Sequence, residues 1–249
     1  MQMNMIINGL PVEANYSEES IREFFLPLLK RLADLYKEKQ ARILCFIAAP
    51  PAAGKSTLAH FLKTLSTEIG GYPETAVIGM DGFHRRQEYL LTHTETRNGE
   101  TFPMVRVKGA PETFDLEKLA ERTKAVASGV ECGWPEYDRL LHNPVDDAIS
   151  VRADIVFFEG NYLLLDQPGW RDLRQYANYT VKIGADPNML RGRLINRKMQ
   201  TGVSYEYAAD FVDFSDMANV RLCLEHSLPA ELNLILDSKG RYSVSENGE

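Results

Sequence analysis

The feature that most constrains the fold is an uninterrupted apolar segment that leads into a glycine–lysine turn. Residues 43–48 read ILCFIA, and such a run is typical of a strand that is covered on both faces of a sheet. Residues 49–57 read APPAAGKST and match the pattern G-x-x-x-x-G-K-[ST], except that Ala49 stands at the first glycine. A helix-like segment over residues 55–68 follows. A strand, a phosphate-binding loop and a helix in this order predict an α/β domain.

The same alternation continues along the chain. Four more apolar runs have the length of buried strands, at residues 75–80, 155–158, 179–183 and 232–236. Further helix-like segments lie between several of them, at residues 115–127, 188–199 and 215–228. Buried strands that alternate with helices predict an α/β fold with a doubly wound, mostly parallel five-stranded sheet flanked by helices. We expect this domain to span residues 43–237.

The two ends of the chain show other patterns. Residues 6–12 hold an Asn-Gly turn signal between apolar residues and predict a β-hairpin. Ser17 or Ser20 is expected to cap a following helix that has one apolar stripe. We expect residues 1–42 to form a hairpin and a helix packed on the core, either as a cap on the sheet or as a homodimer contact. Residues 238–249 are polar and predict a loose tail.

The overall composition limits the classes of partner. The chain has 249 residues with 28 Lys and Arg against 35 Asp and Glu, a net charge of −7, which disfavours nucleic acid as a partner. No apolar run reaches the roughly 18 residues needed to cross a bilayer, and the first residues lack the pattern of a signal peptide. Cys45, Cys132 and Cys223 have unrelated spacings, which fits a reducing compartment better than disulfides or a zinc site. We therefore expect a cytoplasmic protein that acts on a small molecule and has neither a nucleic-acid nor a membrane partner.

The phosphate-loop pattern makes specific chemical demands. Backbone N–H groups must converge at a helix N-terminus, a lysine must reach the β- and γ-phosphates, and a hydroxyl must ligate Mg²⁺. Pro50 and Pro51 lack N–H groups but fall in the front half of the loop, and Pro50 favours an extended Ala49, which avoids the cost of about 1–2 kcal/mol of a left-handed residue. ATP and Mg²⁺ are the expected cofactors. The predicted nucleotide-binding residues are Ala52, Ala53, Gly54, Lys55, Ser56 and Thr57.

Two carboxylates close strand-like segments. Glu159 ends an apolar run and is a candidate Mg²⁺ ligand beside Ser56, and the following Gly160 allows a close backbone approach. The alternative is an ordinary charged strand end. Asp81 ends the second strand, where an acceptor hydroxyl near the γ-phosphate would need a base. The alternative for Asp81 is a turn-forming residue before Gly82.

A basic cluster, Arg191, Arg193, Arg197 and Lys198, lies in an otherwise acidic chain. Arg193 and Arg197 are four residues apart and so share one helical face. Kinases need cations to neutralise the charge that builds up during phosphoryl transfer. We expect residues 187–202 to form a basic lid helix that supplies Arg193 and Arg197, although a solvated helix face explains the same pattern.

Several motifs occur in a specific order along the chain. They are the phosphate loop, Asp81-Gly82-Phe83, PETFD at residues 111–115, Tyr137-Asp138 with His142, FEGNYLL at residues 158–164, and the arginine-rich helix. In this order, over roughly residues 20–237, the chain resembles the P-loop kinases that include uridine kinase, phosphoribulokinase and bacterial-type pantothenate kinase. The resemblance implies that the predicted α/β sheet has the P-loop NTPase/kinase fold. The resemblance implies that Lys55 contacts the β- and γ-phosphates, that Ser56 ligates Mg²⁺, and that Asp81 is the catalytic base. It also implies that Glu159 is the metal-associated acid and that Arg193 or Arg197 is a lid arginine.

The resemblance also suggests an acceptor pocket. Glu112 matches the position that grips sugar hydroxyls in uridine kinases, although it is one methylene longer than their aspartate. Tyr137 and His142 resemble the tyrosine and histidine near their base-binding pocket, and His84 stands where they usually carry tyrosine. These four polar groups are the predicted substrate-binding residues. They suit a polyhydroxy acceptor such as a nucleoside, a sugar or a pantothenate-like alcohol.

The sequence thus predicts an ATP-dependent kinase that transfers the γ-phosphoryl group to a hydroxyl of a small polar metabolite, with Asp81 as base. The alternative is a P-loop ATPase or nucleotide switch that couples hydrolysis to a protein partner. The polar, glycine- and proline-rich segment 81–150 favours the kinase, since it reads as an acceptor-binding insertion over the carboxyl edge of the sheet, where such folds bind ligands. A nucleic-acid-binding module built on residues 191–198 is disfavoured by the net charge of −7.

Overall fold

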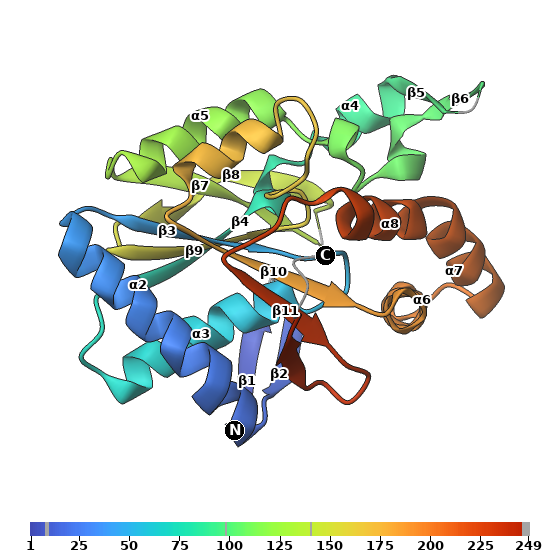
Figure 1. The fold of residues 1–249 in the computed structure, drawn as a ribbon. Helices are drawn as coiled ribbons and strands as arrows, with labels where there is room; N and C mark the ends of the chain where they lie inside the picture. The colour runs from blue at the N-terminus through green and yellow to red at the C-terminus, as the bar shows by residue number, and fades with distance from the viewer. Residues whose placement is uncertain (8–9, 98, 140, 246–249) are drawn as a thin grey trace.

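The computed structural model describes residues 1–7, 10–97, 99–139 and 141–245. At its centre lies a six-stranded sheet in the order β12-β11-β10-β3-β9-β4 (Figure 1). Neighbouring strands pair in parallel except β12, which is antiparallel to β11. In chain order the strands are β3 (Ile43–Ala48), β4 (Thr75–Gly79), β9 (Ile155–Gly160), β10 (Tyr179–Ala185), β11 (Leu232–Leu236) and β12 (Tyr242–Val244).

The prediction of a doubly wound, mostly parallel sheet is confirmed, and burial explains why. Every residue of β3 is buried, and its side chains alternate between two cores, one containing Ile43, Cys45 and Ile47 and the other Leu44, Phe46 and Ala48. Helices α2 (Leu26–Lys39) and α3 (Lys55–Ile69) cover the first face, and α5 (Leu116–Ala127) covers the second (Figure 1). A strand with apolar neighbours on both sides has no polar positions, which is the pattern in the sequence.

The predicted strand number and the predicted loose tail need correction. The sheet has six strands, because residues 242–244 of the segment 238–249 form β12 along the edge of β11. Tyr242 is buried, and its ring lies 6.1 Å from that of Tyr16 and 5.6 Å from that of Phe25. One buried aromatic side chain therefore anchors this strand, and three residues are too few to show a periodic pattern.

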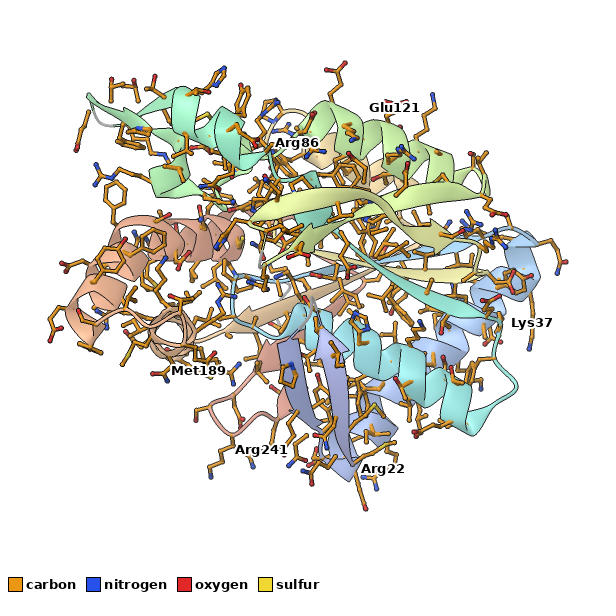
Figure 2. The ribbon with its side chains drawn as sticks, turned by 180° about the vertical axis from the view of Figure 1, so that it is seen from behind. Arg22, Lys37, Arg86, Glu121, Met189 and Arg241 are labelled. Atoms are coloured by element: carbon orange, nitrogen blue, oxygen red, sulfur yellow. The ribbon has the colours of Figure 1, made fainter. Side chains whose placement is uncertain are left out.

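The N-terminal segment packs on the sheet. Strands β1 (Gln2–Ile7) and β2 (Leu10–Asn15) form the expected antiparallel pair, whereas the Asn-Gly turn at residues 8–9 lies outside the described residues. Figure 2, seen from behind, shows this pair beside α3. The helix cap is Ser17, whose Oγ accepts a hydrogen bond from the Ser20 backbone N–H at 3.0 Å. From there α1 (Glu18–Ser20) and a π-helical turn (Ile21–Phe25) lead into α2.

The segment 81–150 has more structure than its sequence predicts, since only α5 was expected. It contains two β-hairpins and several short helical turns. They are η2 (Met80–Phe83), α4 (Gln87–Thr92), β5 (Thr94–Arg97) with β6 (Glu100–Pro103), η3 (Met104–Val107), η4 (Pro111–Thr113), and β7 (Cys132–Asp138) with β8 (Asn143–Val151).

Hairpin β7–β8 is fixed to the turn that follows β4. The Trp134 indole is fully buried, and its Nε1–H donates a hydrogen bond to the Gly79 carbonyl at 2.8 Å. Gly82 packs so closely that a Cβ there would lie 2.0 Å from the Pro135 carbonyl oxygen. Asp81 stands between these two anchors, so the hairpin determines its position.

The remaining helices follow β9 and β10. The predicted helix at 215–228 is present as α8 (Met217–His226), but a separate helix α7 (Tyr205–Phe211) and a π-helical turn (Val212–Asp216) precede it. The arginine-rich helix is α6 (Pro187–Met199), and η5 (Arg171–Tyr176) connects β9 to β10. Within the described residues, no helix combines the length and the apolar character that a membrane span requires.

The close contact of Gly82 with β7 predicts that a larger residue at position 82 destabilises the fold. Gly82→Ala should lower the free energy of unfolding by at least about 2 kcal/mol, because the added Cβ overlaps backbone atoms that no side-chain rotation can move away. Urea unfolding followed by circular dichroism measures the change. Gly192→Ala in α6 is the matched control, since its Cβ meets nothing within 4 Å, and it should raise stability by up to about 1 kcal/mol. Equal stability of Gly82→Ala and the wild type would contradict this packing.

Candidate functional site

A cavity of about 760 Å³ lies at the carboxyl edge of the parallel strands. Ala52, Asp81 and Asn161, which follow the ends of β3, β4 and β9, all contribute to its wall. Open parallel sheets place their ligand sites at this edge. Ten of the residues predicted from the sequence line this cavity: Ala52, Gly54, Lys55, Ser56, Thr57, Asp81, His84, Tyr137, Arg193 and Arg197.

The loop between β3 and α3 presents free amides to the cavity. Gly54 caps α3 with φ +86°, and the first intrahelical bond runs from the Leu58 N–H to the Gly54 carbonyl at 2.9 Å. The amides of the three residues at the start of α3, Lys55–Thr57, therefore have no intrahelical acceptor and lie at the positive end of the helix dipole. An anion is the natural ligand of such a turn.

The loop backbone differs in one respect from the expectation. Ala49 was predicted to avoid the left-handed conformation, and it does. Ala52, for which no such conformation was predicted, is left-handed, with φ +65°. Ala53 is fully buried outside the cavity lining, and its N–H donates to the Pro50 carbonyl at 3.3 Å. Its predicted contact with a nucleotide remains a prediction.

Glu159 is buried directly behind the loop. Ser56 Oγ donates a hydrogen bond to Glu159 Oε1 at 2.8 Å, and Lys55 Nζ lies 3.9 Å from Glu159 Oε2. Burial raises the pKa of Glu159, while the Lys55 ammonium and the Ser56 hydrogen bond oppose that rise. A hydroxyl and a carboxylate side by side supply the hard oxygen ligands that Mg²⁺ prefers, so these two residues fit a magnesium ion.

Asp81 and His84 form a second polar pair in the cavity wall. Burial alone would raise the pKa of Asp81, but His84, Lys55 and Arg139 outweigh it and hold the pKa below its ordinary value. Asp81 is therefore ionised at neutral pH and able to accept a proton. His84 Nδ1 lies 2.8 Å from the Asp81 carbonyl oxygen, and a carbonyl only accepts, so Nδ1 carries the proton. Burial lowers the pKa of His84, while the Asp81 carboxylate opposes that shift.

The basic cluster of α6 has two residues that line the main cavity and two that contact other parts of the protein. Arg193 Nη1 donates to the Ala52 carbonyl at 3.3 Å, and Arg193 and Arg197 both line the cavity. Arg191 instead forms a two-bond ion pair with Asp213, at 2.6 Å and 2.7 Å. Lys198 Nζ lies 3.7 Å from the centre of the Phe211 ring. Only the two arginines chosen for their i, i+4 spacing reach the site.

Two predicted substrate residues lie outside this cavity. Glu112 forms an ion pair with Arg97 and does not contribute to the lining. His142 lines a second cavity of about 580 Å³, which shares Lys108 with the first. Their roles in substrate binding therefore remain predictions that the geometry of the main cavity does not support.

The sequence analysis did not select six polar side chains of the lining: Lys108, Arg139, Asn161, Gln200, Asp216 and Asn219. Asn161 is buried, and its Oδ1 has no hydrogen-bond partner among the described residues. It stands in the motif FEGN, two residues after Glu159, so its position was a usable signal. Arg139 belongs to the turn of a hairpin that the sequence does not predict.

Comparison with known proteins adds independent information. Residues 44–225 match the model of the Phosphoribulokinase / Uridine kinase family. The chain is 38% identical to the uncharacterized protein YggC of Escherichia coli K12, over 97% of this chain and 98% of that protein. It is 31% identical to a proposed uridine kinase of Schizosaccharomyces pombe, over 78% of this chain and 82% of that protein.

A solved structure is also similar. It is a protein from Silicibacter sp. TM1040 that is proposed to be a fructose transport system kinase. The TM-score is 0.69 at 30% sequence identity, and the match covers 81% of this chain and 98% of the other. The matched residues of the family model include the phosphate loop, Asp81, Glu159 and the arginine-rich helix.

The left-handed backbone conformation of Ala52 and Gly54 leads to a second prediction about stability. Gly54→Ala should lower the free energy of unfolding by about 1–2 kcal/mol through backbone strain alone, since its Cβ would meet nothing within 4 Å. Ala52→Gly removes a Cβ from a residue with φ +65° and should leave the protein at least as stable. Denaturant titrations of both variants measure the two effects. A Gly54→Ala variant as stable as Ala52→Gly would mean that the loop does not require a glycine here.

Proposed function

Because this chain belongs to the Phosphoribulokinase / Uridine kinase family, whose members are kinases, we propose that it transfers the γ-phosphoryl group of ATP to a hydroxyl of a small polar metabolite. The match to the family model confirms the resemblance to uridine kinase and phosphoribulokinase that the sequence motifs indicated. One observation carries the proposal to this chain: a single cavity holds the free loop amides, the Asp81 carboxylate, and Arg193 and Arg197 of α6.

The nucleotide side of the cavity is the loop and the start of α3. The amides of residues 55–57 and the Lys55 ammonium bind the β- and γ-phosphates, and Arg193 lies against the loop at the Ala52 carbonyl. Ser56 and Glu159 would hold Mg²⁺, which supplies further positive charge to the phosphates.

The acceptor side begins at Asp81. Its carboxylate takes the proton of the acceptor hydroxyl while the hydroxyl oxygen bonds to the γ-phosphorus in line with the bond that breaks. The products are the phosphorylated acceptor and ADP. Lys55, Arg193 and Arg197 neutralise the charge on the transferred group, so the main tasks of the protein are positioning and electrostatic stabilisation.

The alternative, an ATPase or nucleotide switch, needs no pocket for a second substrate. Here the segment 81–150 contributes Asp81, His84 and Tyr137 to the same cavity as the phosphate loop. This supports a kinase with an organic acceptor. A nucleoside and a sugar are both reasonable acceptors, given the uridine and fructose names of the similar proteins, and a pantothenate-like alcohol fits the same motifs.

The deciding experiment measures ADP release with Mg-ATP alone and with a panel of nucleosides, sugars and pantothenate. A kinase releases ADP faster with at least one of these compounds, and mass spectrometry then detects the phosphorylated product. ADP release at the same rate with and without every compound would support the ATPase instead.

Lys55→Ala tests the phosphate site. The variant should lose at least about 100-fold in kcat, because a positioned cation on the transferred phosphoryl group is missing. Circular dichroism should show an unchanged fold. Lys63→Ala is the matched control, since Lys63 is an exposed residue of the same helix, α3, and the control should keep wild-type activity. Comparable activity of the two variants would rule out the assignment of Lys55.

Asp81→Asn tests the proposed base. The amide has the same shape but cannot accept a proton, so kcat should fall by about 10²–10⁴-fold while the Kd for ATP changes less than about threefold. Asp172→Asn, an exposed residue of η5, serves as control. Near wild-type transfer by Asp81→Asn would show that another group takes the proton.

A further inference from the structure

The charge around the main cavity exceeds what a nucleotide site alone explains. Five cationic side chains line it, against the carboxylates of Asp81 and Asp216, although the whole chain has a net charge of −7. The five are Lys55, Lys108, Arg139, Arg193 and Arg197.

These cations fall into two groups by their place in the fold. Lys55 belongs to the phosphate loop, and Arg193 and Arg197 project from α6, where Arg193 contacts the loop. Lys108 and Arg139 come from the segment 81–150, which also supplies Asp81, His84 and Tyr137. The second group therefore lies on the acceptor side of the cavity.

Lys108 has only neutral partners. Its Nζ donates to Gln87 Oε1 at 2.7 Å and to the His142 carbonyl at 3.0 Å, and lies 5.0 Å from the centre of the Tyr137 ring. No described carboxylate forms an ion pair with it. An ammonium has three N–H donors, so one remains for a ligand.

Arg139 stands out among the arginines of the same segment. Its guanidinium forms neither a hydrogen bond nor an ion pair with any other described residue, yet it lines the cavity and its charge acts to lower the pKa of Asp81. The other five arginines of residues 81–150 each pair with a carboxylate. The pairs are Arg85–Asp115, Arg86–Asp146, Arg97–Glu112, Arg106–Glu100 and Arg122–Asp147.

Neither cation is in ion-pair contact with a described carboxylate, although Asp81 lies near enough to Arg139 for the two charges to interact. Partly buried cations without such a contact are costly unless a ligand supplies an anion. We propose that the acceptor is a hydroxy compound bearing a phosphate or carboxylate group, and that Lys108 and Arg139 bind this anion while the hydroxyl faces Asp81. This inference rests on the proposed kinase function. The proposed function leaves several acceptors open, and this inference favours the anionic ones among them. A neutral nucleoside or an unsubstituted sugar is disfavoured, because it has no phosphate or carboxylate group.

The second cavity extends the same charge pattern. Its wall contains Lys108, shared with the first cavity, together with Arg106 and Lys198, and a single carboxylate, Asp210. An acceptor that is too long for the first cavity would therefore extend beyond Lys108 into the second cavity, whose cationic side chains also suit an anionic group.

The main test compares acceptors in matched pairs, each a neutral hydroxy compound and its phosphate or carboxylate derivative. Fructose with fructose phosphates, ribose with ribose 5-phosphate, and pantothenol with pantothenate are such pairs. The anionic member should have at least about tenfold higher kcat/KM for ADP release. Equal or better use of the neutral member by the wild type would overturn the inference and leave the kinase function standing.

Charge-removing variants locate the anion. Lys108→Ala and Arg139→Ala should each raise the KM for an anionic acceptor at least about tenfold and change the KM for ATP less than about twofold. Lys108→Arg and Arg139→Lys keep the charge and should recover part of the loss. Lys124→Ala and Arg152→Ala, at exposed positions, are the matched controls. Unchanged acceptor KM values in both alanine variants would overturn the assignment.

A binding measurement decides the case without any acceptor. Calorimetry of inorganic phosphate with enzyme saturated by Mg-ADP should show at least about tenfold weaker binding to the Lys108→Ala, Arg139→Ala double variant than to wild type. Equal affinities would show that these residues hold no anion, whatever the acceptor panel gives. Absence of any stimulated ADP release, in contrast, counts against the kinase function itself.

The pH profile gives a separate readout. Burial lowers the pKa of Lys108 to about 8, so its charge, and with it kcat/KM for an anionic acceptor, should decline above pH 8. Lys108→Arg should shift this decline to higher pH. The other titratable and charged groups of the first cavity are Lys55, Asp81, His84, Tyr137, Arg139, Arg193, Arg197 and Asp216. Those of the second cavity are Arg106, His142, Lys198, Tyr207 and Asp210.

Tyr137 and His84, the two titratable groups nearest to Lys108 on the acceptor side, do not account for a decline near pH 8. Burial raises the pKa of Tyr137 to about 12 and lowers that of His84, so both titrate well away from pH 8. A decline that persists unchanged in Lys108→Arg would remove Lys108 from the acceptor site.

Discussion

The register of the three central strands determines where the reactive groups lie. Ala48 of β3 pairs with Gly160 of β9, and Gly79 of β4 pairs with Glu159. All three strands run in parallel and end at the same edge, so the phosphate loop, Glu159 and Asp81 leave the sheet together. A shift of one residue in β9 would turn Glu159 to the opposite face of the sheet and place Phe158 behind the loop. The buried contact between Ser56 and Glu159 depends on this register.

The features of this arrangement that could be predicted from the sequence are those that depend on residues close together along the chain. The strands are buried on both faces, so each appears in the sequence as a continuous apolar run, and the phosphate loop is a local pattern of nine residues. Asp81, Arg193 and Arg197 were predicted to reach the site because they follow a strand or share a helical face, and the structure brings them into one cavity. Short-range signals thus identify most of the residues on the proposed nucleotide side of this cavity.

The acceptor side was less predictable, because hairpins and long-range contacts build it. Strands β5 and β6 have four residues each, and β7 and β8 are longer but mixed in polarity, so none of them shows the continuous apolar run of the central strands. The turn between β7 and β8 brings Arg139 to the cavity and leaves His142 at the neighbouring one. Glu112 matches a family motif, but Arg97 of β5 occupies its carboxylate. A motif indicates a position along the chain, whereas the partner that neutralises a side chain depends on the tertiary fold.

The attachment of β7 to the turn after β4 has a consequence for how acceptor preference can evolve. Trp134 and the close packing of Gly82 fix the base of the hairpin to the segment that carries Asp81. Tyr137 and Arg139 lie farther along, towards its tip. Mutations at the tip can therefore alter the lining of the cavity without moving Asp81, the proposed base. Under the proposed function, such a separation would let one scaffold diversify its substrates while its phosphate chemistry stays the same.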